Sequence, residues 1–298
     1  MGRDRAREVW LARLLYLPLI LVTLAILAYP VVESFRLSFY DQRLIATQAE
    51  ANFVGLGLYL KTFESSEFLK IVQNSAVWVF GNVVLQVVLG LASALVLRER
   101  FRVGAILRTL ILVPWILPPV AMAVIWRWML NASVGVLPYL ALTVGIVDKP
   151  PVTLGSPQLA MPTVICITSW RFFPFLTIVF IGAMQSIPDE LYDAAAVDGA
   201  GMIRSFFAVT VPAIMPTVGI MTLLTAMSTF NIFPYIWLLT QGGPGYETTT
   251  LAVYVYRRGF KEFRLSEAAV VSVVMFVILA LTMFIYFRLT KEDWETTE

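Results

Sequence analysis

Uncharged apolar runs and short polar segments alternate along the whole chain. An apolar run of about 20 residues is long enough to cross the hydrocarbon core of a bilayer as an α-helix. Such runs recur from the N-terminal region to the C-terminal region, and charged or turn-forming residues separate them. We therefore expect six transmembrane helices, at residues 14–38, 71–97, 106–129, 159–184, 212–240 and 267–288.

These runs predict an all-α integral membrane protein. No linker or shift in composition marks a second domain, so residues 1–298 should form a single transmembrane domain. Pro114, Pro118 and Pro119 lie close together and should bend the third helix or leave part of it unwound. The polar stretch 40–70 should lie in water and contain a short surface helix.

The charges between the helices bear on orientation. Six spans place both termini on one side, and the segment after the fourth span shares that side. Basic residues are about equally numerous on the two sides, but the N-terminal tail and the Arg98–Arg102 turn are short and rich in Arg. Short basic segments favour the cytoplasm. We therefore expect cytoplasmic N- and C-termini.

Composition removes several classes of function. Of 298 residues, 59% are hydrophobic and 14% charged, and the mean hydropathy is +0.79, far above a soluble domain. The chain has no His and a single Cys, Cys166, so common metal and nucleophile sites are missing. No G-x-x-x-x-G-K-[ST] loop and no basic, aromatic nucleic-acid-binding stripe occurs. We expect no enzyme activity, no bound cofactor and no nucleic-acid partner.

The cores of the second to sixth spans contain no Asp, Glu or His. Ion-coupled carriers usually place ionisable groups there, and hydrolases need a catalytic constellation. A self-contained ion-coupled carrier or integral membrane enzyme is therefore the disfavoured alternative. Arg171 is the exception in the spans, because a guanidinium there needs acceptors or a wet cavity. It could bind substrate hydroxyls, contact backbone carbonyls or extend its charged end toward the outer surface.

The segment 186–210 is the long polar-to-small stretch in the second half of the chain. Ser186 with Asp189 three residues later resembles a capping box, and Pro188 suits a first helical turn. The run Ala194–Ala196 favours a helix with a small face, and Gly199 should end or bend it. Such a face can sit deep in a groove on another protein.

Motifs in this segment resemble the permease subunits of binding-protein-dependent ABC importers. Asp193-Ala194-Ala195, then Asp198-Gly199-Ala200, then Pro212 is similar to the EAA loop of that family, although Asp193 stands where the family most often has Glu. Further blocks resemble the carbohydrate-importing branch, of the maltose, trehalose and glycerol-phosphate type, and extend the resemblance over almost the whole chain. They are Phe53–Tyr59, Pro114–Pro119, Gln185–Pro188 and Thr240–Pro244.

The resemblance implies a type I importer permease in the bacterial inner membrane. It implies a second permease subunit, which is usually a different chain, a dimeric ABC ATPase that uses ATP and Mg²⁺, an extracytoplasmic substrate-binding protein and surrounding membrane lipid. The residues that it assigns to ATPase coupling are Asp193, Ala194, Ala195, Asp198, Gly199 and Ala200. It also assigns binding-protein docking to the turn containing Gly242, Gly243 and Pro244.

Candidate substrate-path residues lie toward the outer ends of the spans. Aromatic faces can stack on sugars, although the interfacial aromatic belt explains such residues equally simply. Ser228, Asn231 and Tyr235 are spaced to share one face of the fifth helix. With few charges available, a neutral polyhydroxylated solute fits best, and polyamine, phosphate-ester and amino-acid branches stay open. The candidates are Trp126, Trp170, Arg171, Ser228, Asn231 and Tyr235.

Overall fold

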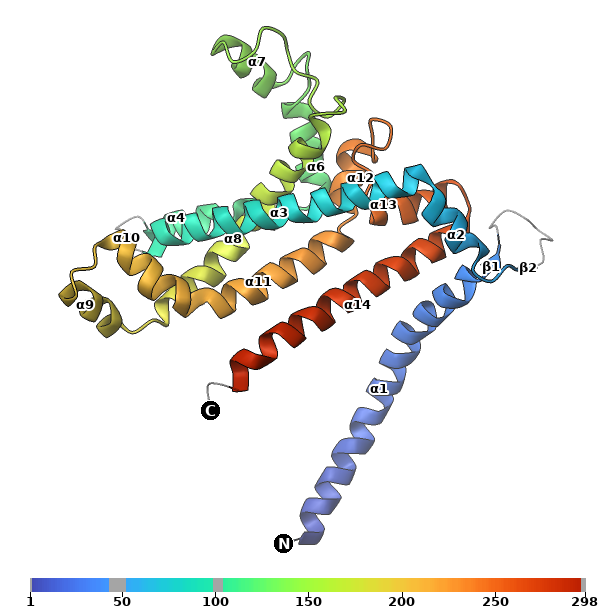
Figure 1. The fold of residues 1–298 in the computed structure, drawn as a ribbon, viewed down its shortest axis with the longest axis horizontal. Helices are drawn as coiled ribbons and strands as arrows, with labels where there is room; N and C mark the ends of the chain where they lie inside the picture. Colours follow the sequence, from blue (N-terminus) through green and yellow to red (C-terminus); the bar gives the residue numbers. More distant parts are fainter. Residues whose placement is uncertain (1, 43–51, 99–103, 296–298) are drawn as a thin grey trace. The chain divides into compact units, whose positions relative to one another are not determined.

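The computed structural model describes residues 2–42, 52–98 and 104–295, and most of them are helical (Figure 1). By contacts the chain forms two compact units. Met1–Phe68 with Tyr254–Ala280 is unit 1, and Leu69–Val253 with Leu281–Glu298 is unit 2. The expected single domain stays a prediction. Within the described residues, five helices are long and apolar enough to cross a membrane, or six spans if one bent pair counts as a span.

Unit 1 contains the N-terminal helix and the residues that follow it. A two-stranded antiparallel pair follows α1, and the short helix α2 confirms the surface helix expected between residues 40 and 70. Tyr59 of α2 donates to Ser38 Oγ at 2.7 Å, which ties α2 to the end of α1. The elements of this region are α1 (Gly2–Ser38), β1 (Tyr40–Asp41), β2 (Asn52–Phe53), α2 (Gly57–Glu64), the start of α3 (Ser66–Arg98), η2 (Arg257–Lys261) and the first part of α14 (Leu265–Glu295).

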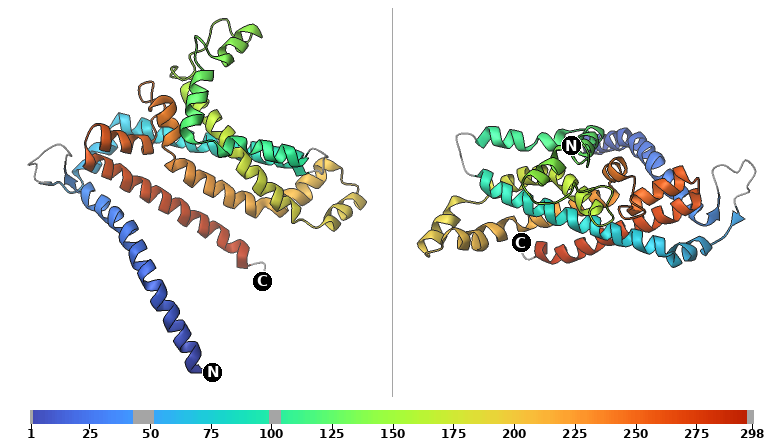
Figure 2. Two further views of the ribbon diagram at one scale, coloured as in Figure 1. Left: turned by 180° about the vertical axis from the view of Figure 1, so that it is seen from behind. Right: turned by 90° about the horizontal axis from the view of Figure 1, so that it is seen from above.

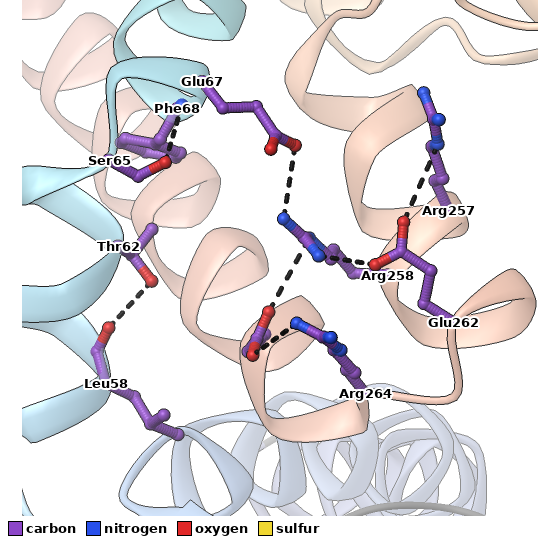
Figure 3. Close-up of polar contacts among 10 residues, drawn as sticks. Leu58, Thr62, Ser65, Glu67, Phe68, Arg257, Arg258, Glu262 and Arg264 are labelled. Atoms are coloured by element: carbon purple, nitrogen blue, oxygen red, sulfur yellow. Dashed lines mark hydrogen bonds and ion pairs between the residues drawn. The ribbon is translucent and has the colours of Figure 1, made fainter.

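Arg258 is the centre of an ion-pair cluster in unit 1. Its Nη2 donates to Glu67 at 3.2 Å, and its Nη1 donates to Glu262 (Figure 3). Its Nε lies 3.6 Å from a carboxylate oxygen of Glu267. The guanidinium also stacks 4.8 Å from the ring centre of Tyr254. Burial in this cluster raises the pKa of the Tyr254 hydroxyl to about 12. The cluster joins η2 to the first turns of α3 and α14.

Unit 2 is built around α8 (Ala160–Gln185). The helices α3, α8 and α11 (Val211–Asn231) lie side by side in both further views (Figure 2). Added Cβ atoms on Gly81 and Gly90 would come within 2.9 Å of α8 side chains, so small residues set this close approach. Other elements are α4 (Gly104–Ile111), α5 (Val113–Ile116), α6 (Pro119–Met129), α7 (Val136–Thr143), α9 (Asp189–Val197), α10 (Met202–Ser205), η1 (Phe206–Thr210), α12 (Pro234–Thr240) and α13 (Leu251–Tyr256), which ends in unit 1.

Two predicted spans of unit 2 are broken. The third is bent by 94° between residues 106–116 and 119–129, which confirms the bend expected from the prolines. The fifth was expected to be continuous from 212 to 240, but α11 ends at Asn231 and α12 begins at Pro234. Pro234 has no N–H to donate, and its ring would clash with the carbonyl of Phe230 in a regular helix, which favours a bend or a break at this point.

Candidate coupling loop and translocation path

The helix α9 carries three of the six predicted coupling residues, and the other three directly follow it. It starts at Asp189, and Asp189 and Glu190 place two carboxylates at the positive end of the helix dipole. The expected capping role of Ser186 is wrong: Ser186 is the C-cap of α8, and its Oγ donates to the Ala183 carbonyl at 2.8 Å. Because α8 ends at Gln185, Ser186 belongs to the preceding helix, and Pro188 takes the N-cap position of α9.

The end of α9 follows the sequence prediction. Gly199 has φ +74°, a left-handed conformation that costs glycine nothing. The Gly199 N–H donates to the Ala196 carbonyl, and the Ala200 N–H donates to the Ala195 carbonyl. These two bonds form a Schellman motif that satisfies the last carbonyls of the helix. Gly199 therefore ends α9 as expected and redirects the chain toward α10.

The surface of α9 and α10 is exposed and partly apolar. No residue of α9 is buried, and Asp193, Ala194 and Asp198 face solvent, while Ala195 and Ala200 are half-buried. Figure 1 shows both helices beyond the ends of α8 and α11. An exposed apolar patch bordered by polar residues is typical of a protein or membrane contact site. The large exposed apolar residues of α9 and α10 are Leu191, Val197, Met202 and Ile203.

Tyr192 fastens α9 to the spans. Arg98 Nη1 donates to the Tyr192 hydroxyl at 2.8 Å, and the guanidinium lies 4.5 Å from the centre of its ring. The same hydroxyl lies 2.9 Å from Thr210 Oγ1. Reasoning from the sequence missed this contact, although an aromatic residue beside an alanine run was a usable signal. Tyr192 thus connects α9 with the last residue of α3 and the last residue of η1.

Arg171 contacts the break in the bent span. Its Nε and Nη2 donate to the Leu117 carbonyl at 3.3 and 3.0 Å. Leu117 is the C-cap of α5, and the prolines that follow have no N–H with which to continue the helix. The guanidinium also lies 4.7 Å from the ring centre of Phe172 and 5.1 Å from that of Tyr235. The structure thus has the backbone contact that is one of the expectations for Arg171, and its substrate role stays a prediction.

The other predicted path residues occupy three environments. Trp126 and Trp170 meet edge to face with ring centres 5.4 Å apart. Ser228 and Asn231 are on α11, where their side chains donate to the carbonyls of Leu224 and Met227. Tyr235 is buried on α12, so the expectation that it shares one helix face with Ser228 and Asn231 is wrong. The break at 232–233 separates them.

A groove of about 620 Å³ lies beside the bent span. Its lining is apolar and comes from α3, α4, α5 and α8, and Trp170 is the predicted path residue that reaches it. Trp170 therefore lies between this groove and Trp126. The groove is open along one side, so it is a surface groove and not an enclosed cavity.

The predicted docking turn after α12 has a fixed conformation. Gly242 is buried with φ +87°, and Thr249 Oγ1 donates to its carbonyl at 2.8 Å. Thr248 Oγ1 donates to the Gly243 carbonyl, and the Gly243–Pro244 peptide bond is cis. The turn is anchored to α3, where Asn74 donates to the Tyr246 carbonyl at 2.6 Å. Gly242 is therefore a buried part of the turn, and its carbonyl accepts the hydrogen bond from Thr249.

A known protein family matches most of this chain. Residues 86–291 match the family described as binding-protein-dependent transport system inner membrane component. The chain belongs to this family. The predicted class of transport permease is thereby confirmed, as are its all-α membrane fold and its place in the inner membrane.

Several curated proteins are similar to this permease over nearly its full length. A probable ABC transporter permease protein of Brucella suis biovar 1 is 33% identical, covering 94% of this chain and 96% of the relative. The trehalose/maltose transport system permease protein MalF of Thermococcus litoralis is 31% identical, covering 96% and 95%. The sulfoquinovosyl glycerol transport system permease protein SmoG of Agrobacterium fabrum is 30% identical, covering 94% and 90%.

A solved structure shares the fold of the permease. A chain of the bacterial alginate ABC transporter, in complex with alginate pentasaccharide-bound periplasmic protein, superposes with a TM-score of 0.84. The match covers 98% of both chains at 22% identity. A second structure of an alginate importer gives a TM-score of 0.81 at 23% identity. At this identity the likeness supports the fold.

Proposed function

We propose that this permease forms half of the path of an ABC importer for a sugar or related polyhydroxylated solute. A second, different permease subunit completes the path, and a dimeric ATPase supplies the energy. The permease itself is not catalytic and binds no cofactor, and ATP and Mg²⁺ belong to the ATPase. The exposed apolar surface of α9 and α10 is the observation that carries this proposal.

The ATPase docks on α9 and α10 in the cytoplasm. The small Ala194 lets a groove on the partner approach the backbone of α9, while Val197 and Met202 supply apolar area at 89% and 86% exposure. Asp193 and Asp198 face solvent beside this surface and can meet basic groups at the rim of the groove. This arrangement requires cytoplasmic termini and a cytoplasmic loop 186–210.

The substrate class follows from the chemistry near the predicted path. Ser228 and Asn231 offer a hydroxyl and an amide on an α11 segment without charged residues, and both can exchange hydrogen bonds with a neutral solute. Trp126 and Trp170 can stack against an apolar sugar face. Two relatives are named for trehalose/maltose and sulfoquinovosyl glycerol transport. The binding protein docks at the outer turn that contains Gly242, Gly243 and Pro244.

The coupling claim is tested in the complex of both permeases, the ATPase and the binding protein. Residues 193–200 are replaced by a Gly/Ser segment of equal length, and residues 145–152 of the outer loop are replaced in the same way as a control. The first change should abolish substrate-stimulated ATP hydrolysis while the protein still inserts into the membrane, and the second should keep stimulation. Full stimulation after the first replacement would refute the coupling role.

The substrate claim has a separate measurement. The melting temperature of the cognate binding protein is measured with a panel of sugars, polyols, polyamines, amino acids and phosphate esters. A rise with a neutral sugar or polyol supports the proposal. A rise only with a charged amine, amino acid or phosphate ester would contradict it.

A further inference from the structure

The contacts of Tyr192 join three elements at one side chain. Its hydroxyl accepts a hydrogen bond from Arg98, the last residue of α3, and bonds with Thr210, the last residue of η1. Its ring lies under the Arg98 guanidinium. Arg98 directly follows the second predicted span, and the residue after Thr210 begins α11. A displacement of α9 therefore acts on α3 and on the start of α11 through the Tyr192 side chain.

The burial pattern of α9 supports this role. Among its nine residues, Tyr192 and Ala195 are half-buried, and all the others are exposed. These two residues are three positions apart, so they lie on one face of the helix. Thr210 is only 2% exposed. The Tyr192–Thr210 bond is consequently shielded from water on the Thr210 side, where a hydrogen bond is stronger than at the surface.

The element that receives the contact is itself unusual. The segment η1 is a π-helical turn between α10 and α11. Such turns are rare and often occur at functional sites. Because Thr210 lies at its junction with α11, a change in the Tyr192 contact acts where the helix geometry changes.

We propose that Tyr192 is the positioning residue of the coupling loop. It holds α9 at a fixed angle to the ends of α3 and η1, and so converts a movement of α9 into a movement of α11. This inference rests on the proposed ATPase contact, but it names a residue outside the exposed surface that the ATPase would cover. It assigns to Tyr192 the transmission of the movement, and to the exposed residues the docking.

The decisive variant is Tyr192→Phe in the assembled importer. Phe keeps the ring under Arg98 and removes both hydroxyl contacts. We expect the ratio of substrate-stimulated to basal ATP hydrolysis to fall about five- to tenfold, within the usual range of coupling between sites. Thr210→Val should lower the ratio similarly. Thr210→Ser keeps the hydroxyl, so it should keep the wild-type ratio. Tyr139→Phe, on the exposed helix α7, is the matched control and should leave the ratio unchanged.

A double variant separates transmission from general damage. If the two hydroxyls act as one contact, Tyr192→Phe with Thr210→Val should be no worse than Tyr192→Phe alone. Additive losses would overturn the proposal, as would a normal ratio in Tyr192→Phe. Loss of the ATPase from purified Tyr192→Phe complexes would also overturn it, because Tyr192 would then be a docking contact. Failure of the proposed function gives a different result, because the wild-type complex itself would then show no substrate-stimulated ATP hydrolysis.

Discussion

Arg171 donates two hydrogen bonds to the backbone at the break in the bent span. The bend at Pro118 and Pro119 leaves the Leu117 carbonyl without a helical partner, and Arg171 supplies two donors to it. The two features are therefore complementary: the break needs a donor, and the guanidinium needs an acceptor. A fully buried carbonyl that loses its donor costs about 1–3 kcal/mol, and the carbonyl of the half-buried Leu117 should cost less.

Replacement of Arg171 by Met should lower the thermal stability of the purified permease complex by several degrees. The Leu117 carbonyl would lose both of its hydrogen bonds from α8. Arg127→Met is the matched control, because Arg127 is exposed and contacts the Leu238 carbonyl only at 3.5 Å. The measurement is the midpoint of unfolding in detergent. Equal shifts for the two variants would contradict the structural role of Arg171.

Two glycines in the turn after α12 allow a similar comparison. A Cβ on Gly242 would lie 2.5 Å from Thr249 Oγ1, whereas a Cβ on Gly245 would meet nothing within 4 Å. Both have positive φ, so Ala costs about 1–2 kcal/mol of backbone strain at each position. Gly242→Ala should reduce solute uptake well below that of Gly245→Ala. Equal uptake would show that the conformation of this turn is unimportant.

At the scale of elements, nearby residues in the sequence are sufficient to predict some helix bends and ends, and insufficient to predict caps and contacts that depend on other elements. The bend near Pro118 and the end of α9 at Gly199 could be predicted, because the residues that cause them lie at the site itself. The role of Ser186 could not, because it depends on where α8 ends. The partners of Tyr192 could not either, since Arg98 lies 94 residues away and Thr210 lies 18 residues away.

The C-terminal end of α9 gives a prediction at this scale. Gly199→Ala places a Cβ in a left-handed conformation and costs about 1–2 kcal/mol, although the space around it is open. Stimulated ATP hydrolysis should fall, and Gly199→Asn should restore part of it because Asn tolerates this conformation better. Gly201→Ala is the control, since Gly201 has φ −70° and open space. Equal effects of Gly199→Ala and Gly201→Ala would contradict the capping role.

At the scale of the whole molecule, the spans and the family follow from sequence because hydropathy and motif spacing extend along the entire chain. The positions of the candidate substrate-path residues could be predicted less well from the sequence. Ser228, Asn231 and Tyr235 were placed on one continuous helix, and the break before Pro234 put Tyr235 into the core of unit 2. Helical periodicity holds only while the helix continues, and long-range packing decides where a proline-containing span breaks.

The proposed function depends on the ATPase contacting α9. A photo-crosslinker attached at Val197→Cys, in a Cys166→Ala background, tests this contact in the assembled importer. Val144→Cys, 72% exposed at the end of α7, is the control. We expect an adduct with the ATPase from position 197 and none from position 144. An adduct from position 197 with the binding protein, or the absence of any ATPase adduct there, would contradict the account.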